Sequence, residues 1–442
     1  MRVIDAWAPE PEEVLIERAG AAVARVARRM LGGTYGRTVV VVAGKGNNGA
    51  DGRVAARLLA GRGVRVRVVD AAAPGSIGAA DLVIDAAYGT GFRGSWSPPD
   101  VGDAPVLAVD VPSGVDALTG EAGGDVLAAT RTITFAALKP GLLVPPGSEM
   151  AGQVEVADIG LDVSSAHAHL VQRADVAAWW PQRPLDAHKW QQAVRIVAGS
   201  PTMTGAAVLA SHAAMRAGAG MVALSVPGQL AAHAPLEVVQ RELPRSDWAG
   251  PALDSLERFK AVVCGPGLGR SDSTAADVRR FVVEAALPMV VDGDALFALA
   301  WSSDGAADLL RRRRAPTVLT PHDGEYKLLT GQAPVADRLV AARRLAADTR
   351  CVVLLKGPAT VVAEPHGATL VVTAGDARLA TAGTGDVLAG LLGALLAGGL
   401  TAAHAAAAAA WVHGHAARRG HDVGFVASDL PDLIPLVTQG FA

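Results

Sequence analysis

TVVVVAGKGNNGADG, residues 38–52, is an apolar run that passes directly into a glycine-rich turn. A short run of β-branched residues predicts a buried strand. After the turn, residues 53–62 have the pattern of a helix, and residues 64–69 form a second apolar run. This order predicts a βαβ unit whose loop lies at the carboxyl end of the first strand, where open α/β sheets bind their ligands.

The glycine-rich turn is compatible with two kinds of ligand. The glycines of residues 44–49 match the dinucleotide pattern G-x-G-x-x-G, and Asp70 follows at about the distance of a ribose-binding acid. The same turn, however, carries the polar side chains of Asn47, Asn48 and Asp51. Side-chain oxygens of this kind suit a hydroxylated ligand or a hard cation, so both interpretations stay open at this point.

Two more apolar runs of the first half end on carboxylates. Residues 81–85 end at Asp85 before a glycine-rich turn, and residues 106–110 end at Asp110 before Val-Pro-Ser-Gly. A single aspartate at a strand end is more often a loop cap. Together with Asp51, these acids favour a ligand site at the carboxyl edge of the predicted sheet.

The second half has its own glycine-rich stretch, TAGTGDVLAG at residues 381–390, at the start of a long Ala/Leu/Gly-rich helix. The first amides of a helix have no partners within it and can bind an anion. Asp386 could take a proton from a substrate hydroxyl while these amides stabilise a transferring phosphoryl group. The alternative is a helix start that Asp386 merely caps. The P-loop pattern G-x-x-x-x-G-K-[ST] does not occur in the sequence.

From Arg195 onward, apolar runs alternate with helical patterns, which predicts a second, mostly parallel sheet with helices on both faces. Several polar residues follow its predicted strands. Asp292 and Asp294 could hold magnesium through waters or cap a helix. His322 and Lys356 reach the same edge, but a capped core histidine and a lysine extending from a strand end are equally good descriptions of them.

Composition limits the classes of function. The 442 residues predict two domains, and the net charge of −3 argues against a nucleic-acid surface. Two cysteines in apolar runs and the lack of a secretion signal predict a cytoplasmic protein without a disulfide framework. The apolar region 387–412 is interrupted at Gly398-Gly399, so we expect buried core helices and no membrane partner. We expect a linker at residues 163–185, where periodicity is lost.

Four motifs of the first half occur in order: G-x-G-N-N-G-x-D-G, I-D-x-x-x-G-T-G, V-D-V-P-S-G-V-D and T-I-T-F-x-x-x-K-P-G. They resemble the amino-terminal YjeF domain, the NAD(P)H-hydrate epimerase family, over residues 1–162. The resemblance implies that Asp110 is the acid/base and that Asn48, Asp85 and Ser113 hold a potassium ion. It also implies that the hydrated cofactor is bound by Asn47, Asn48, Gly49, Ala50, Asp51, Gly89, Thr90, Gly91, Phe92, Arg93, Gly94, Ser95 and Asp110.

Six motifs of residues 186–442 resemble the carboxyl-terminal YjeF domain, the NAD(P)H-hydrate dehydratase of the ribokinase-like fold: G-S-P-x-M-x-G-A, G-P-G-L-G, V-D-G-D-A-L, L-T-P-H-x-G-E, L-L-K-G and A-T-A-G-T-G-D-V-L-A-G. By this resemblance Asp386 is the catalytic base. The implied contacts to the hydrated cofactor are Ala206, Gly267, His322 and Asp386, and those to ADP, which is expected with magnesium, are Lys356, Gly357, Pro358, Ala359, Thr360 and Gly385.

We therefore expect two α/β domains, each a doubly wound and mostly parallel sheet, the first Rossmann-like and the second ribokinase-like. The resemblance implies a bifunctional, homo-oligomeric enzyme that interconverts the R and S epimers of hydrated NADH and NADPH. It then dehydrates the S epimer by phosphorylation and loss of phosphate, converting ADP to AMP. A vitamin or sugar kinase with a noncatalytic dinucleotide-binding first domain is the alternative, because the same fold serves such kinases.

Overall fold

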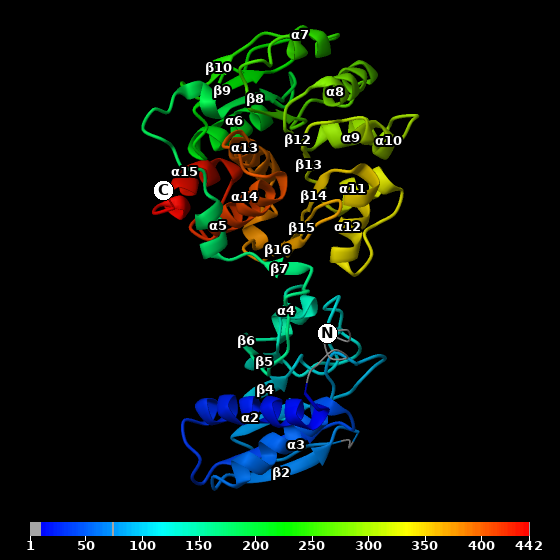
Figure 1. Ribbon diagram of the computed structural model, residues 1–442, viewed down its shortest axis with the longest axis vertical. Coiled ribbons are helices and arrows are strands. Elements are labelled where there is room, and N and C mark those ends of the chain that lie inside the picture. The colour runs from blue at the N-terminus through cyan, green and yellow to red at the C-terminus, as the bar shows by residue number, and fades with distance from the viewer. Residues whose placement is uncertain (1–9, 73–74, 442) are drawn as a thin grey trace. The chain divides into compact units, whose positions relative to one another are not determined.

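The computed structural model of the protein describes residues 10–72 and 75–441 (Figure 1). The described residues fall into two compact units, which are divided between Ala166 and His167. Each unit is built around its own β-sheet, as the two series of strand and glycine patterns predict.

The sheet of the first unit has six strands, all parallel to their neighbours. In spatial order these are β2 (Arg65–Asp70), β1 (Thr38–Ala43), β3 (Leu82–Ala86), β4 (Val106–Val109), β5 (Arg131–Phe135) and β6 (Gln153–Ala157). Because the chain leaves β1 toward β2 and then returns to the other side of β1 with β3, the strand order reverses at β1. Open α/β sheets bind ligands at the carboxyl ends of the strands beside such a reversal.

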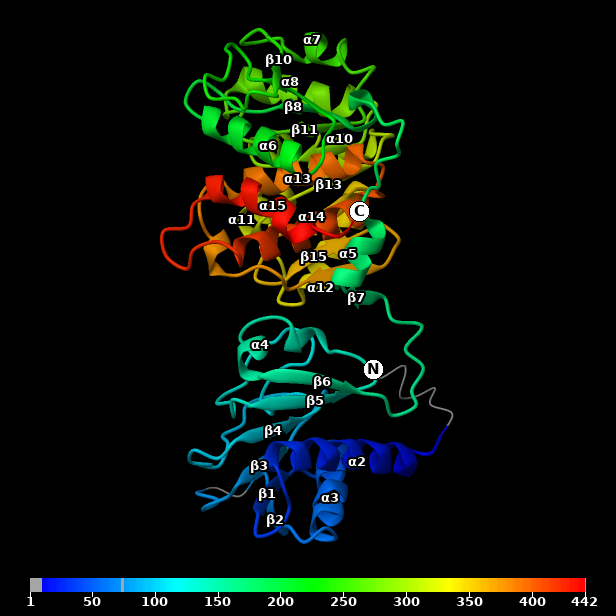
Figure 2. The ribbon, with the colours of Figure 1, turned by 90° about the vertical axis from the view of Figure 1, so that its left-hand side faces the viewer.

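Two helices cover one face of this sheet, α2 (Glu12–Leu31) and α3 (Asn47–Ala60), whereas connecting segments and two short helical turns cover the other (Figure 2). Alternate residues of β1 explain the two layers. Val39 and Val41 pack with the helices, and Val40 and Val42 pack on the opposite side with Phe92 and Trp96.

Helix α3 begins six residues earlier than the sequence pattern predicts, at Asn47 rather than at Arg53. Gly46 precedes it with φ −87° and ψ −169°, an extended conformation that suits the residue before a helix. The polar residues Asn47, Asn48 and Asp51 therefore lie in the first turns of a helix, where backbone amides are free, and not in a loop.

The close approach of α3 to β1 requires glycine at one position. A Cβ atom built on Gly49 would lie 2.0 Å from the backbone oxygen of Gly44, whereas one on Gly46 would have no atom within 4 Å. We expect Gly49→Ala to destabilise the protein by about 2 kcal/mol or more, because the backbone must shift. Gly46→Ala, the matched control, should stay within about 0.5 kcal/mol of the wild type. Thermal unfolding of both variants checks this, and equal losses would contradict it.

The sheet of the second unit has ten strands. In spatial order these are β10 (Val239–Gln240), β9 (Met221–Ser225), β8 (Ala193–Val197), β11 (Ala261–Cys264), β12 (Met289–Val291), β13 (Thr317–Leu319), β14 (Val352–Leu355), β15 (Thr360–Ala363), β16 (Thr369–Val372) and β7 (Ala168–Leu170). Only β15 is antiparallel to its neighbours. The predicted mostly parallel sheet is present, and β15 forms antiparallel pairs with β14 and β16.

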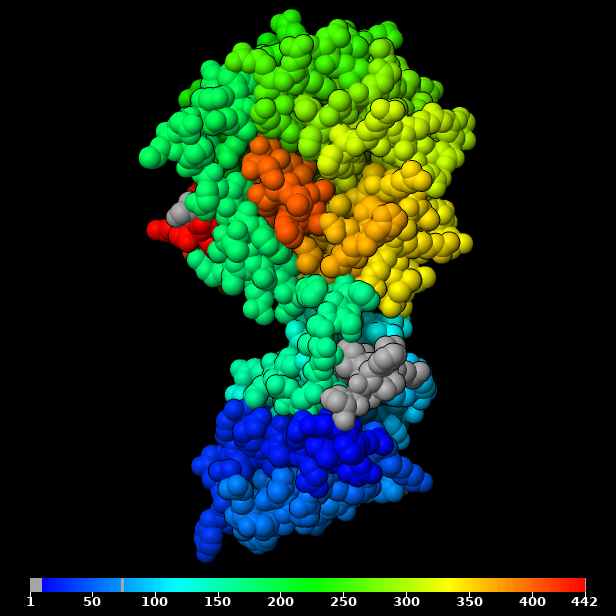
Figure 3. Space-filling model, in the orientation of Figure 1, coloured from blue at the N-terminus to red at the C-terminus, as the bar shows by residue number. Residues whose placement is uncertain are grey.

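Helices cover both faces of this second sheet (Figure 1). One face carries α5 (Arg173–Trp179), α6 (Thr204–Arg216), α13 (Thr384–Ala397), α14 (Ala402–Ala417) and α15 (Leu430–Thr438). The other carries α7 (Ala249–Leu253), α8 (Asp272–Glu284), α9 (Asp294–Ala300), α10 (Ala306–Arg311), α11 (Asp323–Thr330) and α12 (Arg338–Thr349). In Figure 3 the orange surface of the α13 region lies between green and yellow segments that are distant in sequence.

The apolar region 387–412 forms most of α13 and α14, and nearly all of it is buried in the core of the second unit. Small residues allow the close packing of these helices. A Cβ atom on Gly390, for instance, would lie 1.9 Å from the backbone oxygen of Ala210 in α6. Within residues 10–72 and 75–441, no helix is long and apolar enough to cross a membrane.

The segment expected to be a linker, residues 163–185, instead supplies two elements of the second unit. Strand β7 pairs in parallel with β16 at the sheet edge. Helix α5 places Val176 in the core, and Trp179 packs against it and stacks on His404 at 4.3 Å between ring centroids. These contacts join residues about 200 positions apart, so no local sequence pattern announces them.

Candidate active sites

The first unit has a cleft of about 960 Å³ at the carboxyl ends of β1, β3 and β4. Its lining includes many of the residues predicted for the hydrated cofactor: Asn47, Asn48, Asp51, Gly89, Thr90, Gly91, Phe92 and Asp110. Asp70, at the end of β2, lines it as well. The other predicted contacts, Gly49, Ala50, Arg93, Gly94 and Ser95, are outside this lining. Of these, Arg93, Gly94 and Ser95 are exposed.

Asp110 directly follows β4 and is held from several sides. Its side chain is an acceptor for Lys139 Nζ at 2.7 Å, for Thr134 Oγ1 at 3.2 Å and for the backbone N–H of Thr90 at 3.1 Å. Its φ is +68°, a left-handed conformation that is rare for aspartate. Backbone strain of this kind concentrates at functional sites, where surrounding contacts hold it in place.

Asp51 is the second buried acid of the cleft, and 7% of it is exposed. Burial, reinforced by the negative charge of Asp110, raises the pKa of Asp51 to about 8. Asp51 therefore holds a proton at neutral pH. A carboxylate and a carboxylic acid lining one cleft form a pair that can both accept and donate a proton.

Two of the three residues predicted to hold potassium, Asp85 and Ser113, are in contact at the same edge of the sheet. Asp85 is fully buried and accepts hydrogen bonds from Ser113 Oγ at 2.6 Å and from Ser113 N at 2.8 Å. Burial raises the pKa of Asp85 to about 6, although these hydrogen bonds oppose the shift. Among the described residues, neither side-chain atom of Asn48 has a hydrogen-bond partner, although both are buried. Carboxylate, amide and hydroxyl oxygens are a donor set that suits a hard cation.

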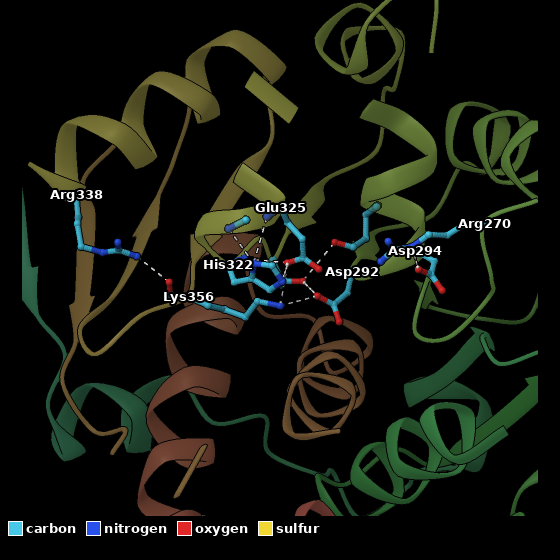
Figure 4. A network of polar contacts seen from close by, with 10 residues as sticks. Arg270, Asp292, Asp294, His322, Glu325, Arg338 and Lys356 are labelled. Atoms are coloured by element: carbon cyan, nitrogen blue, oxygen red, sulfur yellow. Dashed lines mark hydrogen bonds and ion pairs between the residues drawn. The ribbon is translucent and has the colours of Figure 1, made fainter. Parts of the chain in front are cut away.

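The second site lies at the carboxyl edge of the larger sheet, where Asp386 occupies the first turn of α13 (Figure 4 shows the polar network beside it). Burial, together with the negative charge of Asp292 and against the positive charge of Lys356, raises the pKa of Asp386 to about 7. At neutral pH this carboxyl is therefore close to half ionised, a suitable state for a general base.

Lys356 follows β14 and joins two acids, as Figure 4 shows. Its Nζ lies 3.0 Å from Asp292 Oδ1 and 3.4 Å from Glu325 Oε2. Burial alone would lower the pKa of Lys356, but these two ion pairs raise it above its ordinary value, so it stays charged. A Cβ atom on Gly385 would lie 3.7 Å from Lys356 Nζ, an ordinary contact. Packing within the unit does not require glycine there, which leaves room for a bound group as its explanation.

Other predicted residues of this edge also come together. A Cβ atom on Gly267 would lie 2.8 Å from that of Ala206, so the loop after β11 and the start of α6 are adjacent. His322 caps α11, with Nδ1 accepting the amides of Gly324 and Glu325 at 3.0 and 3.2 Å. Nδ1 therefore carries no proton, and Nε2 is left as the donor of a neutral ring. His322 can therefore cap α11 through Nδ1 and contact a ligand through Nε2 at the same time.

The sequence analysis assigned no role to three basic residues near the two sites, Lys139, Arg338 and His413. Lys139 bonds Asp110 in the first unit. In the second unit, Arg338 donates to the backbone oxygen of Lys356 at 2.7 Å, and His413 of α14 lies 2.9 Å from the backbone oxygen of Thr384. Burial lowers the pKa of His413 to about 4, so its ring is neutral and donates to that carbonyl through Nε2. The only sequence signal was the Lys-Pro-Gly of residues 139–141.

Comparison with known proteins first defines the class. The second unit has the fold of a ribokinase-like superfamily protein from Enterococcus faecalis V583, with a TM-score of 0.54 and 20% identity, over 62% of this chain and 97% of that one. At this identity the likeness concerns the fold alone. The chain is thus a two-unit α/β protein whose second unit is ribokinase-like.

The family follows from closer matches. The model described as NAD(P)H-hydrate dehydratase matches residues 194–437, and that of the YjeF-related protein N-terminus matches residues 12–77 and 70–141. The bifunctional NAD(P)H-hydrate repair enzyme Nnr of Moorella thermoacetica is 36% identical over 97% of this chain and 93% of its own. That of Mycobacterium leprae is 41% identical over 92% and 89%. The chain belongs to the family of bifunctional NAD(P)H-hydrate repair enzymes.

A solved structure supports the assignment of the second unit. The ADP/ATP-dependent NAD(P)H-hydrate dehydratase from Bacillus subtilis, co-crystallized with ATP/Mg²⁺, is 30% identical and has a TM-score of 0.52, over 60% of this chain and 96% of its own. Family membership favours the repair enzyme over the vitamin or sugar kinase that the fold alone would also allow.

Proposed function

We propose that the first unit interconverts the R and S epimers of hydrated NAD(P)H and that the second unit dehydrates the S epimer with ADP. The observation that carries this proposal is the same in both units. In a chain of this family, a carboxyl group that can take a proton lies at the carboxyl edge of each sheet, beside a charged lysine.

In the first unit we assign proton transfer to Asp110. Inverting a ring carbon that bears a hydroxyl and an amine requires a base for the hydroxyl proton and a source of a proton for the departing nitrogen. Asp110, paired with Lys139, is the base, and Asp51, which is protonated at neutral pH and lines the same cleft, would supply the proton. The glycines and amides of residues 44–51 and 89–92 would bind the dinucleotide around this pair.

We propose that Asn48, Asp85 and Ser113 hold a potassium ion in the first unit. The buried and unpartnered amide of Asn48 and the buried Asp85 fit such an ion, because a cation would satisfy both. The ion would fix the loops after β1, β3 and β4 relative to one another. Asp85, whose pKa burial raises to about 6, would then remain ionised.

Potassium is therefore expected to stabilise the protein. At a concentration ten times the dissociation constant, binding to the folded state alone contributes about 1.4 kcal/mol. The Tm of the protein in KCl should therefore be higher than its Tm in choline chloride of equal ionic strength, by roughly 2–4 °C. The effect should disappear in Asp85→Asn, and an equal gain in that variant would exclude this site.

In the second unit we assign the base to Asp386. It would take the proton from the ring hydroxyl while the amides of the first turn of α13 hold the phosphoryl group that ADP transfers. Phosphorylation converts the hydroxyl into a good leaving group, and loss of phosphate restores the nicotinamide, so ADP leaves as AMP. Lys356 would neutralise phosphate charge, and Gly357, Pro358, Ala359 and Thr360 follow it in the nucleotide loop.

Magnesium fits this site only as a companion of the nucleotide. Asp292 is already bonded to Lys356 and Thr320, and Asp294 to Arg270 and the amide of Gly269. Throughout residues 10–72 and 75–441, no group of three or more histidine, cysteine or acidic residues could hold a metal ion. A magnesium ion held mainly by phosphates, with at most one or two carboxylates, is the usual arrangement in such enzymes.

Time-resolved chromatography of both epimers with the full-length protein tests the proposal. Without ADP, each pure epimer should relax to the same mixture. With ADP and magnesium, both epimers should disappear. NAD(P)H, measured by its absorbance, should then appear in the same molar amount as AMP and phosphate. A stable phosphorylated product without that absorbance would identify a kinase instead.

The buried, unpaired Cys264 and Cys351 support a cytoplasmic location, and a homo-oligomer remains our prediction.

A further inference from the structure

Among the described residues, two lysines line the first cleft. Lys45 is exposed, whereas Lys139 is buried, with 3% of its surface exposed. It lies in the segment after β5, just before the turn at Pro140. A buried ammonium group is unfavourable unless its charge is paired and its three N–H groups find acceptors. The environment of Lys139 meets both conditions within a few residues of Asp110.

Three acceptors surround the ammonium group. Nζ lies 2.7 Å from Asp110 Oδ1, 2.8 Å from Thr134 Oγ1 and 2.8 Å from the backbone oxygen of Phe135. The hydroxyl of Thr134, which accepts from Lys139, is itself 3.2 Å from Asp110 Oδ1 and can donate to it. Lys139 and Thr134 therefore both direct hydrogen atoms at the same carboxylate oxygen.

This arrangement makes the two oxygens of Asp110 different. Oδ1 is contacted by Lys139 and Thr134, whereas Oδ2, among the residues that the structure describes, accepts only the amide of Thr90, at 3.1 Å. Oδ2 also faces Gly89, where a Cβ atom would lie 3.0 Å from it. Gly89 lines the cleft, so the missing side chain leaves Oδ2 open toward the ligand space. Two ionisable groups lie near Asp110. Lys139 forms an ion pair with it, and a negative charge on Asp51 would repel its carboxylate.

We propose that Lys139 is the positioning residue of the epimerase site: together with Thr134 it holds Asp110 Oδ1 and thereby turns Oδ2 toward the hydroxyl proton of the substrate. This inference rests on the proposed function of the first unit. It assigns Lys139 no contact with the reacting atoms. Its contribution is to fix the orientation of the group that takes the proton.

Two pairs of variants test the inference in the full-length protein. Lys139→Met removes the charge and keeps the length of the side chain, and Lys139→Arg retains a charge. Thr134→Val removes the hydroxyl beside Asp110. Thr132→Val is its matched control, because Thr132 is also fully buried on β5 but donates to the backbone oxygen of Ala151 at 2.7 Å, away from Asp110.

We expect Lys139→Met to slow epimer exchange at pH 7 by at least about 10-fold, mainly in kcat, since a correctly held acid/base contributes about 10²-fold or more. The KM for the epimers should change by less than about 3-fold, because Lys139 has no contact with the substrate in this proposal. Lys139→Arg should recover part of the rate. Thr134→Val should be slower than Thr132→Val, which should exchange at nearly the wild-type rate.

Several outcomes would overturn the inference. An unchanged exchange rate in Lys139→Met would do so, as would a slow variant whose loss lies in KM and not in kcat, or one whose rate Lys139→Arg does not recover in part. If Lys139→Met fails to fold, equal rates for the two threonine variants decide against it. The proposed function fails separately, if the wild-type protein does not exchange the epimers at all. ADP-dependent loss of the S epimer reports, in every variant, that the second unit is intact.

Discussion

Asp386→Asn is expected to abolish the ADP-dependent loss of the S epimer while making the protein more stable at pH 8. Without its base, the second unit should dehydrate the S epimer at least about 10³-fold more slowly, within the range that a positioned general base contributes. Exchange between the two epimers should continue in the first unit. The added mixture of epimers should therefore remain at its equilibrium ratio in the presence of ADP.

The gain in stability follows from the raised pKa of Asp386, which moves from 3.8 to about 7. Below about pH 4 the carboxyl group is protonated in both the folded and the unfolded protein, so it adds no penalty. Between pH 4 and 7 the unfolded chain loses the proton before the folded one does, and the folded state is progressively disfavoured. Asparagine removes this penalty. The gain should be absent at pH 4 and should reach on the order of 2 kcal/mol above pH 7, since part of the carboxyl group contacts solvent.

Asp376→Asn provides a control of the opposite sign in the same unit. Hydrogen bonding and charge pairing with Arg378 lower the pKa of Asp376, so its carboxylate stabilises the folded state at neutral pH and this contribution is lost as the pH falls. Measured by thermal unfolding at pH 5 and pH 8, the Tm difference from the wild type should therefore rise with pH for Asp386→Asn and fall with pH for Asp376→Asn. Retained dehydration in Asp386→Asn would remove Asp386 from the mechanism. Lost dehydration with a lower Tm at pH 8 would indicate damage to the fold instead.

The architecture was largely predictable because each strand carries a local signal. A short apolar run rich in valine that ends in glycine, as at residues 38–44 and 261–265, is typical of a buried strand followed by a tight turn. These runs also predicted the edges at which the acids lie: Asp85 and Asp110 at the carboxyl edge of the first sheet, and Asp292 at that of the second. The carboxyl ends of parallel strands must meet there whatever the details of packing.

Features that depend on contacts between distant segments were not predictable. The start of α3 at Asn47 is set by how closely Gly44 and Gly49 approach each other, and the pairing of β7 with β16 joins residues 168–170 to residues 369–371. The basic partner Lys139 appeared in a motif without a role. Its ion pair with Asp110 forms only because β4, which Asp110 follows, lies beside β5.

Two neighbouring residues show how far the site itself could be predicted. Ser113 and Asp85, which fall in different motifs, are joined by two hydrogen bonds, so two of the three residues inferred for potassium meet in the folded unit, and their role as ligands stays a prediction. Arg93, inferred as a contact of the hydrated cofactor, is exposed and outside the cleft lining, with Asp116 Oδ2 3.4 Å from its Nη1 atom, so its contact with the cofactor stays a prediction. A motif defines which residues occur near one another in sequence, but the direction of each side chain depends on the turn that carries it.

Asp110→Asn is expected to give the converse of Asp386→Asn. Epimer exchange should fall by at least about 10²-fold, because asparagine cannot take the hydroxyl proton. The second unit should still consume the S epimer with ADP. A mixture of epimers should thus lose its S fraction rapidly and keep its R fraction, apart from spontaneous exchange, and chromatography of the two species during the reaction measures both steps in one sample.

The same substitution should also lower stability, because it leaves the buried ammonium of Lys139 without a countercharge, and breaking a buried ion pair costs about 3–5 kcal/mol when one partner is removed. Asparagine keeps an oxygen for hydrogen bonding, so the lower end of that range is expected. The double variant Asp110→Asn/Lys139→Met separates the two effects, since it removes both charges. It should recover much of the lost Tm but none of the exchange activity. If restoring stability also restored exchange, the loss in Asp110→Asn would have come from unfolding, and another group would have to move the proton.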